Sequence, residues 1–144
     1  MIKTVVSFRV AGDLVDCREL DHLTGLASSA AADEGSRHLR PVSSEAWTVE
    51  AGPLITGLGG ASSSGLEGLL RQLAGILDGS ADLIRAYCAA HDLAAVFEIW
   101  IQSSDGALPS LVVTPEFAQL ASSVGADIDI DICPWLGDEW RPDR

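Results

Sequence analysis

Basic residues are scarce in this sequence. The chain has 144 residues, with nine Lys and Arg against 21 Asp and Glu, so its formal charge is −12 at pH 7. A negative field of this size repels nucleic-acid phosphates and anionic membrane surfaces. We therefore expect neither nucleic acid nor membrane among the partners. The charge favours a basic protein or a cation instead.

Long apolar runs and closely spaced cysteines are also lacking. No run of 18 apolar residues occurs, so no transmembrane helix is predicted. The first residues show no signal-peptide pattern. The three cysteines, Cys17, Cys88 and Cys133, are odd in number, far apart and without a C-x-x-C pair. Three cysteines leave room for one disulfide, but this pattern favours a protein of the reducing cytoplasm over a disulfide framework.

The strongest pattern in the chain lies near its C-terminal end. Residues 114–125 predict a helix, with Thr114 as its cap, Pro115 at its first position and Gly125 as its stop. Asp127, Asp129 and Asp131 then alternate with Ile128, Ile130 and Ile132, as in a strand with one apolar face. Such a strand belongs to a sheet that is covered on one side only.

Three earlier segments predict further strands, at residues 3–10, 45–50 and 93–102. In the first, the core-facing set is Thr4, Val6, Phe8 and Val10, and the outward set is Lys3, Val5, Ser7 and Arg9. In the third, one face carries Ala95, Phe97, Ile99 and Ile101, and the other carries Val96, Glu98, Trp100 and Gln102.

Helical periodicity or capping residues mark four helices, near residues 16–25, 66–77, 80–91 and 114–124. The order of elements predicts an α+β fold with a ferredoxin-like β-α-β repeat. We expect a four-stranded antiparallel sheet with helices packed on one face. The domain is expected to span residues 1–133, with flexible loops at 28–44 and 52–65 and a C-terminal tail at 134–144.

Several short motifs together resemble a known bacterial family. They are Ser7 to Asp13, Leu23 to Leu26, Trp47, Leu111 to Phe117 and the Asp-Ile repeat from Asp127. On these residues the chain resembles the family called domain of unknown function 4279, over most of residues 5–133. The resemblance implies a small bacterial α+β protein and carries no established activity.

The outward face of the sheet is the predicted interaction surface. Trp100 shares this face with Val5, and an exposed Trp among aliphatic residues is typical of a protein interface. The alternative is that the 28–44 loop or the tail, with Trp135 and Trp140, covers it. If the last strand lies beside the first, Lys3 and Arg9 pair with the aspartates. The predicted interaction residues are Trp100, Glu98, Val5, Arg9, Asp127, Asp129 and Asp131.

No set of residues points to catalysis, a metal or a cofactor, and we expect none of these. Carboxylates on alternate strand residues stand about 6.6–7 Å apart, whereas one Ca²⁺ or Mg²⁺ needs ligands within about 2.0–2.6 Å. The glycine-rich stretch from Gly57 to Gly65 lacks the lysine of a phosphate-binding loop. The sequence favours a non-enzymatic protein-binding module, for example an immunity-type protein with a basic partner. A homodimer through the open sheet face is a second form. The alternative class is a small metal-dependent or anion-binding enzyme or regulatory domain that uses the acidic face.

Overall fold

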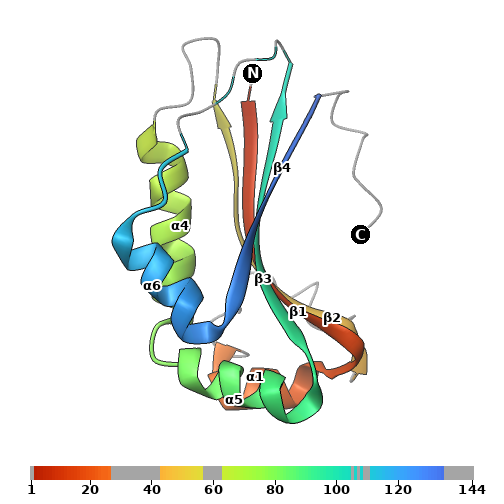
Figure 1. Ribbon diagram of the computed structural model, residues 1–144. Helices are drawn as coiled ribbons and strands as arrows, with labels where there is room; N and C mark the ends of the chain where they lie inside the picture. Colours follow the sequence, from red (N-terminus) through yellow and green to blue (C-terminus); the bar gives the residue numbers. More distant parts are fainter. Residues whose placement is uncertain are drawn as a thin grey trace.

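The computed structural model describes residues 2–26, 43–56, 63–104, 106, 108 and 111–134. These residues form an α+β fold around an open sheet (Figure 1). In chain order the elements are β1 (Ile2–Asp16), α1 (Cys17–Thr24), β2 (Ser43–Thr56), α4 (Ser63–Leu77), α5 (Ala81–His91), β3 (Ala94–Ser103), α6 (Pro115–Val124) and β4 (Ala126–Pro134).

The four strands lie in the order β2-β1-β3-β4, and the sheet is mixed. β1 runs antiparallel to β2 and β3, whereas β4 runs parallel to β3. The expectation of an antiparallel sheet with the last strand beside the first is therefore wrong. A parallel pair needs a long crossover, and residues 104–125, which include α6, supply one. The Asp-Ile alternation marks a half-exposed strand but does not choose its neighbour. The ferredoxin-like repeat stays a prediction.

β2 is longer than the sequence indicated. It takes in residues 52–56, which were expected to belong to a loop, and α4 begins at Ser63. Between Ala51, which pairs with Val6, and Leu54, which pairs with Thr4, β2 has one residue more than β1. Gly52 lies in this bulge with φ 108°, a conformation that side chains disfavour, so a glycine at a bulge was mistaken for the start of a loop. Residues 28–42 and 57–62 of the two predicted loops lie outside the described residues.

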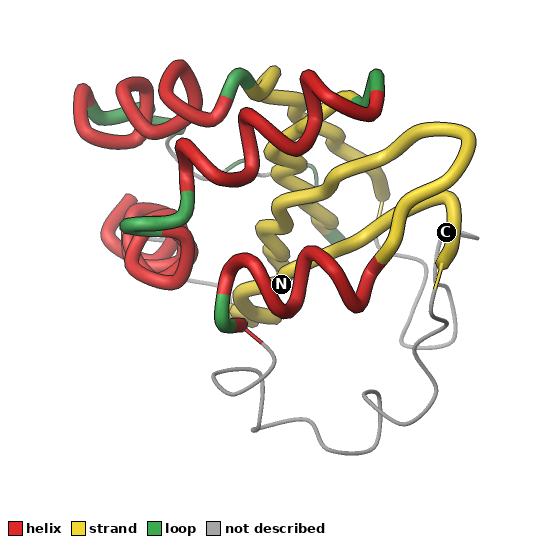
Figure 2. Tube along the Cα trace, turned by 90° about the horizontal axis from the view of Figure 1, so that it is seen from below, coloured by secondary structure: helices red, strands yellow, loops and turns green. Residues whose placement is uncertain are grey.

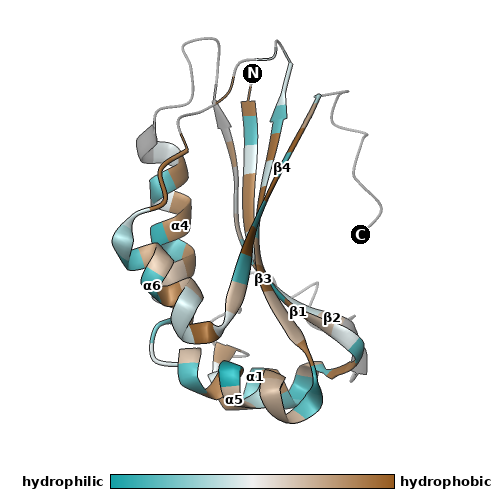
Figure 3. Ribbon diagram, in the orientation of Figure 1, coloured by the Kyte–Doolittle hydropathy of each residue, from teal (hydrophilic) through white to brown (hydrophobic). Residues whose placement is uncertain are grey.

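The face of the sheet that packs against the helices is the one predicted to be apolar. Helices α4 and α6 lie along the sheet, and α1 and α5 pack at one end of it (Figure 1). Phe97 is fully buried and its ring lies 4.9 Å from that of Phe8 and 4.8 Å from that of Phe117, between centroids. Figure 2 shows the twisted strands beside the helices, and Figure 3 colours both strands and helices by the hydropathy of their residues. The predicted core-facing residues of β1 and β3 are all buried.

The helix ends follow the predicted signals. Asp16 Oδ1 accepts hydrogen bonds from the backbone N–H groups of Arg18 and Glu19, each at 3.1 Å, so it caps α1. Thr114 Oγ1 accepts from Phe117 N at 3.3 Å and caps α6. Gly125 ends α6 in the left-handed conformation, with φ 72°. This glycine turn leads directly into β4 and sets the first residue of its alternation.

Candidate functional site

The side of the sheet that faces away from the helices is called the outer face here. Strand pairing defines it, because residues paired across strands point to the same side. Its successive rows are Thr48, Arg9, Val96 and Asp127; then Glu50, Ser7, Glu98 and Asp129; then Val5, Trp100 and Asp131; then Lys3, Gln102 and Cys133. All seven predicted interaction residues lie on this face. The register confirms their shared face, and their part in binding stays a prediction.

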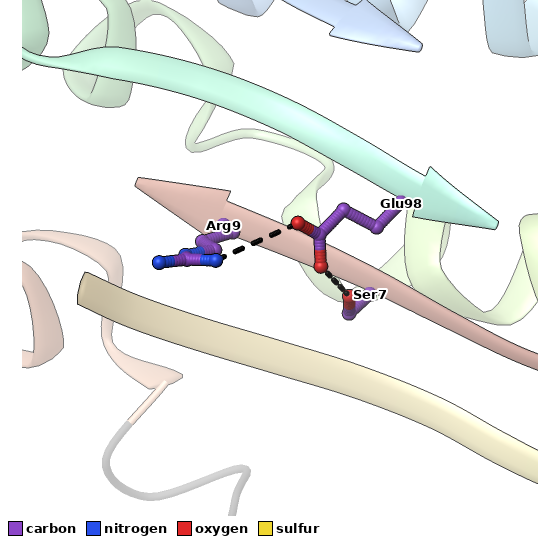
Figure 4. Close-up of polar contacts among 3 residues, drawn as sticks. All are labelled: Ser7, Arg9 and Glu98. Atoms are coloured by element: carbon purple, nitrogen blue, oxygen red, sulfur yellow. Dashed lines mark hydrogen bonds and ion pairs between the residues drawn. The ribbon is translucent and has the colours of Figure 1, made fainter. Parts of the chain in front are cut away.

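A polar cluster occupies the middle of the outer face (Figure 4). Glu98 on β3 accepts a hydrogen bond from the Ser7 hydroxyl at 3.3 Å through Oε2. Its other oxygen, Oε1, lies 3.6 Å from Arg9 Nη1 and forms an ion pair. Ser7 is almost fully buried beneath its longer neighbours, and the Arg9 and Glu98 side chains are about one-third exposed. Glu98 therefore connects two positions of β1 and fixes the Arg9 side chain at the surface.

The expectation that the three aspartates of β4 pair with β1 is wrong. β3 lies between β4 and β1, so Arg9 reaches Glu98 and not an aspartate. Asp127, Asp129 and Asp131 are all exposed. Within the described residues, none of the three side chains takes part in a salt bridge or hydrogen bond. They form an acidic row along the edge of the sheet.

Trp100 lies on the outer face, but the expectation that it is exposed is wrong. Its side chain is only 9% exposed. Lys3 Nζ lies 6.0 Å from the ring centroid, within the range of a cation–π contact. The 28–44 loop and the tail lie outside the described residues, apart from strand residues 43, 44 and 134. That one of these two segments covers Trp100 therefore stays a prediction. Trp100 supports its neighbours on the face and is not an exposed anchor.

Cys133 lies beside Trp100 at the end of β4. Its Sγ donates to the carbonyl oxygen of Ile101 at 3.7 Å. Burial raises the pKa of the Cys133 thiol, the nearby Asp131 carboxylate raises it further, and a hydrogen bond with Trp100 works in the opposite direction. The shift favours the protonated thiol over the nucleophilic thiolate. Cys17 and Cys88 are buried, and none of the three cysteines forms a disulfide.

Sequence reasoning left several residues of the outer face out of the site. Thr48 and Glu50 belong to it through β2, whose pairing with β1 could not be placed from the sequence. Gln102 was assigned to the correct face, yet it is only 1% exposed, and its Nε2 has no hydrogen-bond partner among the described residues. The signal available in the sequence was the outward alternation of the first and third strands, which together hold Ser7, Glu98 and Gln102.

The described part of the chain gives no geometric support to a metal site. No group of three or more His, Cys, Asp or Glu side chains there is placed to hold a metal ion. The aspartates occupy successive rows of one strand, at the spacing that separates ligands rather than bringing them together. Among the described helices, none is long and apolar enough to span a membrane.

The fold and face define a class of protein: an α+β domain whose mixed sheet is covered by helices on one side and carries a charged outer face on the other. The chain belongs to the family described as Domain of unknown function (DUF4279), whose model matches residues 2–135. No curated protein and no solved structure matches the chain. Membership agrees with the resemblance seen in the sequence, and the family description states no activity.

Proposed function

We propose that this domain is a non-enzymatic interaction module that binds a basic partner protein through its outer face. One observation carries the proposal, namely the excess of carboxylates on that face. In the described rows, five acidic residues oppose two basic ones, a difference of three negative charges. The acidic residues are Glu50, Glu98, Asp127, Asp129 and Asp131, and the basic ones are Lys3 and Arg9.

The arrangement of these charges supports recognition of a protein surface. Arg9 and Glu98 already neutralise each other, so the excess lies on the edge strand, where the three aspartates are exposed. Exposed charges of one sign raise the association rate with an oppositely charged partner and reject partners of the same charge. Buried Trp100, Val5 and Ser7 lie on the strands beside this acidic row.

The proposal extends to the compartment and the biological role of the protein. The three cysteines, none of which forms a disulfide, favour the reducing cytoplasm of a bacterium as the place where the protein acts. Within that setting we propose an immunity-type role, in which residues 1–133 act as one domain that neutralises a basic toxin domain. Such a partner has the positive charge that the outer face selects.

Binding of a short lysine-rich peptide tests the proposal. We expect the wild type to bind it at low ionic strength and to lose affinity as the Debye length falls from about 30 Å to about 8 Å at physiological salt. The variant Asp127→Asn, Asp129→Asn, Asp131→Asn is expected to bind about tenfold more weakly or worse, which corresponds to about 1.4 kcal/mol.

The control is a variant with the same change in net charge on the helical side. Asp78→Asn, Asp82→Asn and Asp92→Asn remove three exposed carboxylates near α5. This variant is expected to bind the peptide nearly as well as the wild type. Equal weakening by the two triple substitutions would show that net charge alone acts, and would overturn the assignment to the outer face.

A further inference from the structure

Strand β4 forms one edge of the described sheet. In the part of the chain that the structure describes, β4 pairs with β3 and has no strand on its other side. Every second residue of an edge strand points its backbone N–H and C=O groups away from the sheet. In Figure 1, β4 passes in front of β3 and ends at the margin of the sheet. The edge therefore offers a row of hydrogen-bonding groups to an incoming chain.

The charged side chains of β4 protect this edge, but its backbone geometry does not. β4 pairs with β3 over nine consecutive positions, from Ala126 to Pro134, without a shift of register. It contains no lysine and no bulge, and its proline is at the very end. Ile130 is 41% exposed and Ile132 is 47% exposed, although both lie on the helix-packed face. One side of the edge thus presents isoleucines and the other side aspartates.

The β4 strand of a second copy of the chain does not fit this edge. Residues that pair across two strands lie on the same face of the sheet. If β4 paired with β4 of another copy, aspartates would therefore lie opposite aspartates. Like charges directly opposite each other destabilise a strand pair. The acidic row thus selects against self-pairing, while its charge is complementary to a basic strand.

We propose that β4 accepts an extended segment of the partner as a fifth strand, and that this segment alternates Lys or Arg with aliphatic residues. Its basic side chains lie over Asp127, Asp129 and Asp131, and its aliphatic side chains lie beside Ile130 and Ile132. The period-two pattern of the partner matches that of β4, since the two strands have the same rise. This inference rests on the proposed function and specifies how the basic partner is held.

Three peptides of equal length and charge separate strand addition from simple charge attraction. The first alternates Lys and Val, the second has the same composition with the lysines in one block, and the third is the alternating peptide with N-methyl groups on every second amide. We expect the alternating peptide to bind at least tenfold more tightly than the other two. For the complex, NMR is expected to show new protection of alternate β4 amides from hydrogen exchange.

The outcomes distinguish this inference from the function on which it rests. If the three peptides bind equally and the Asp127, Asp129, Asp131 to Asn variant weakens all of them, recognition of basic partners stands and strand addition is wrong. If none of the peptides binds more weakly to that variant than to wild type, the proposed function itself fails. Sedimentation adds a check, because we expect a monomeric wild type, and a stable wild-type dimer joined through β4 would overturn the inference.

Discussion

β3 and β4 are neighbours with the same alternation, yet they differ in burial. Phe97, Ile99 and Ile101 on β3 are at most 1% exposed. Their partners on β4 are Ile128, which is half-buried, and Ile130 and Ile132, which are more than 40% exposed. The difference arises because, among the described strands, β3 lies between two neighbours and β4 has only one. Alternation therefore reports which face a residue occupies, and position in the sheet decides how deeply it is buried.

The largest expected effect comes from truncating the same face on the two strands. Phe97→Ala removes a ring that packs against Phe8 and Phe117, and it should lower the free energy of unfolding by about 3–5 kcal/mol. Ile130→Ala, on the exposed part of β4, should cost about 1 kcal/mol. Urea denaturation of the two variants measures both values, and similar losses would contradict the edge position of β4.

A second substitution probes the bulge at the opposite side of the sheet. Gly52→Ala places a Cβ atom 3.0 Å from the carbonyl oxygen of Thr4, at a φ of 108°. We expect a loss of about 1–3 kcal/mol from backbone strain. Gly68→Ala, in helix α4 with open space around the new Cβ, is the matched control and should stabilise the protein slightly. A neutral Gly52→Ala result in thermal denaturation would mean that the bulge is wrongly placed.

Much of the fold followed from the sequence, and the parts that did not have a common cause. The helix caps Asp16 and Thr114 and the facing of Phe97 and Trp100 depend on residues close in the chain, which is why they were predicted correctly. The position of β4 beside β3 depends on how a crossover folds back, and no local pattern encodes it. The sequence left the exposure and the burial of Trp100 as alternatives, because local alternation does not encode what covers a residue. Alternation alone placed the seven candidate residues on one face of the sheet, but it did not give their pairing.

The ion pair on the outer face should contribute less than either change above. A double-mutant cycle with Arg9→Ala and Glu98→Ala is expected to give a coupling of about 0.2–1 kcal/mol, because the two side chains are partly exposed. The coupling should shrink as salt is added. Chemical denaturation at low and high salt measures it. Strong coupling between Arg9 and Asp129 in a parallel cycle would instead favour the antiparallel arrangement.

The smallest effect concerns the pH dependence of stability, and it compares a thiol on helix α5 with a thiol on strand β4. Burial raises the pKa of Cys88 on α5 and of Cys133 on β4 above the ordinary value of 9.0. A raised folded-state pKa means that stability is complete below pH 9.0 and is lost as pH rises through the folded-state value. Stability curves of the wild type, Cys88→Ser and Cys133→Ser should therefore differ in slope above pH 9. Tyr87, whose pKa burial also raises, contributes to all three curves. Identical slopes in the three proteins would contradict the burial of the thiols.

Amide hydrogen exchange in the free protein shows whether the edge of β4 is open, as binding of a fifth strand requires. Residue-resolved NMR should show slow exchange along β3, whose amides bond to strands on both sides. In β4 from Ala126 to Cys133, slow amides facing β3 should alternate with fast amides facing outward. Uniformly slow exchange throughout β4 would show that another segment already occupies the edge, and would contradict the account.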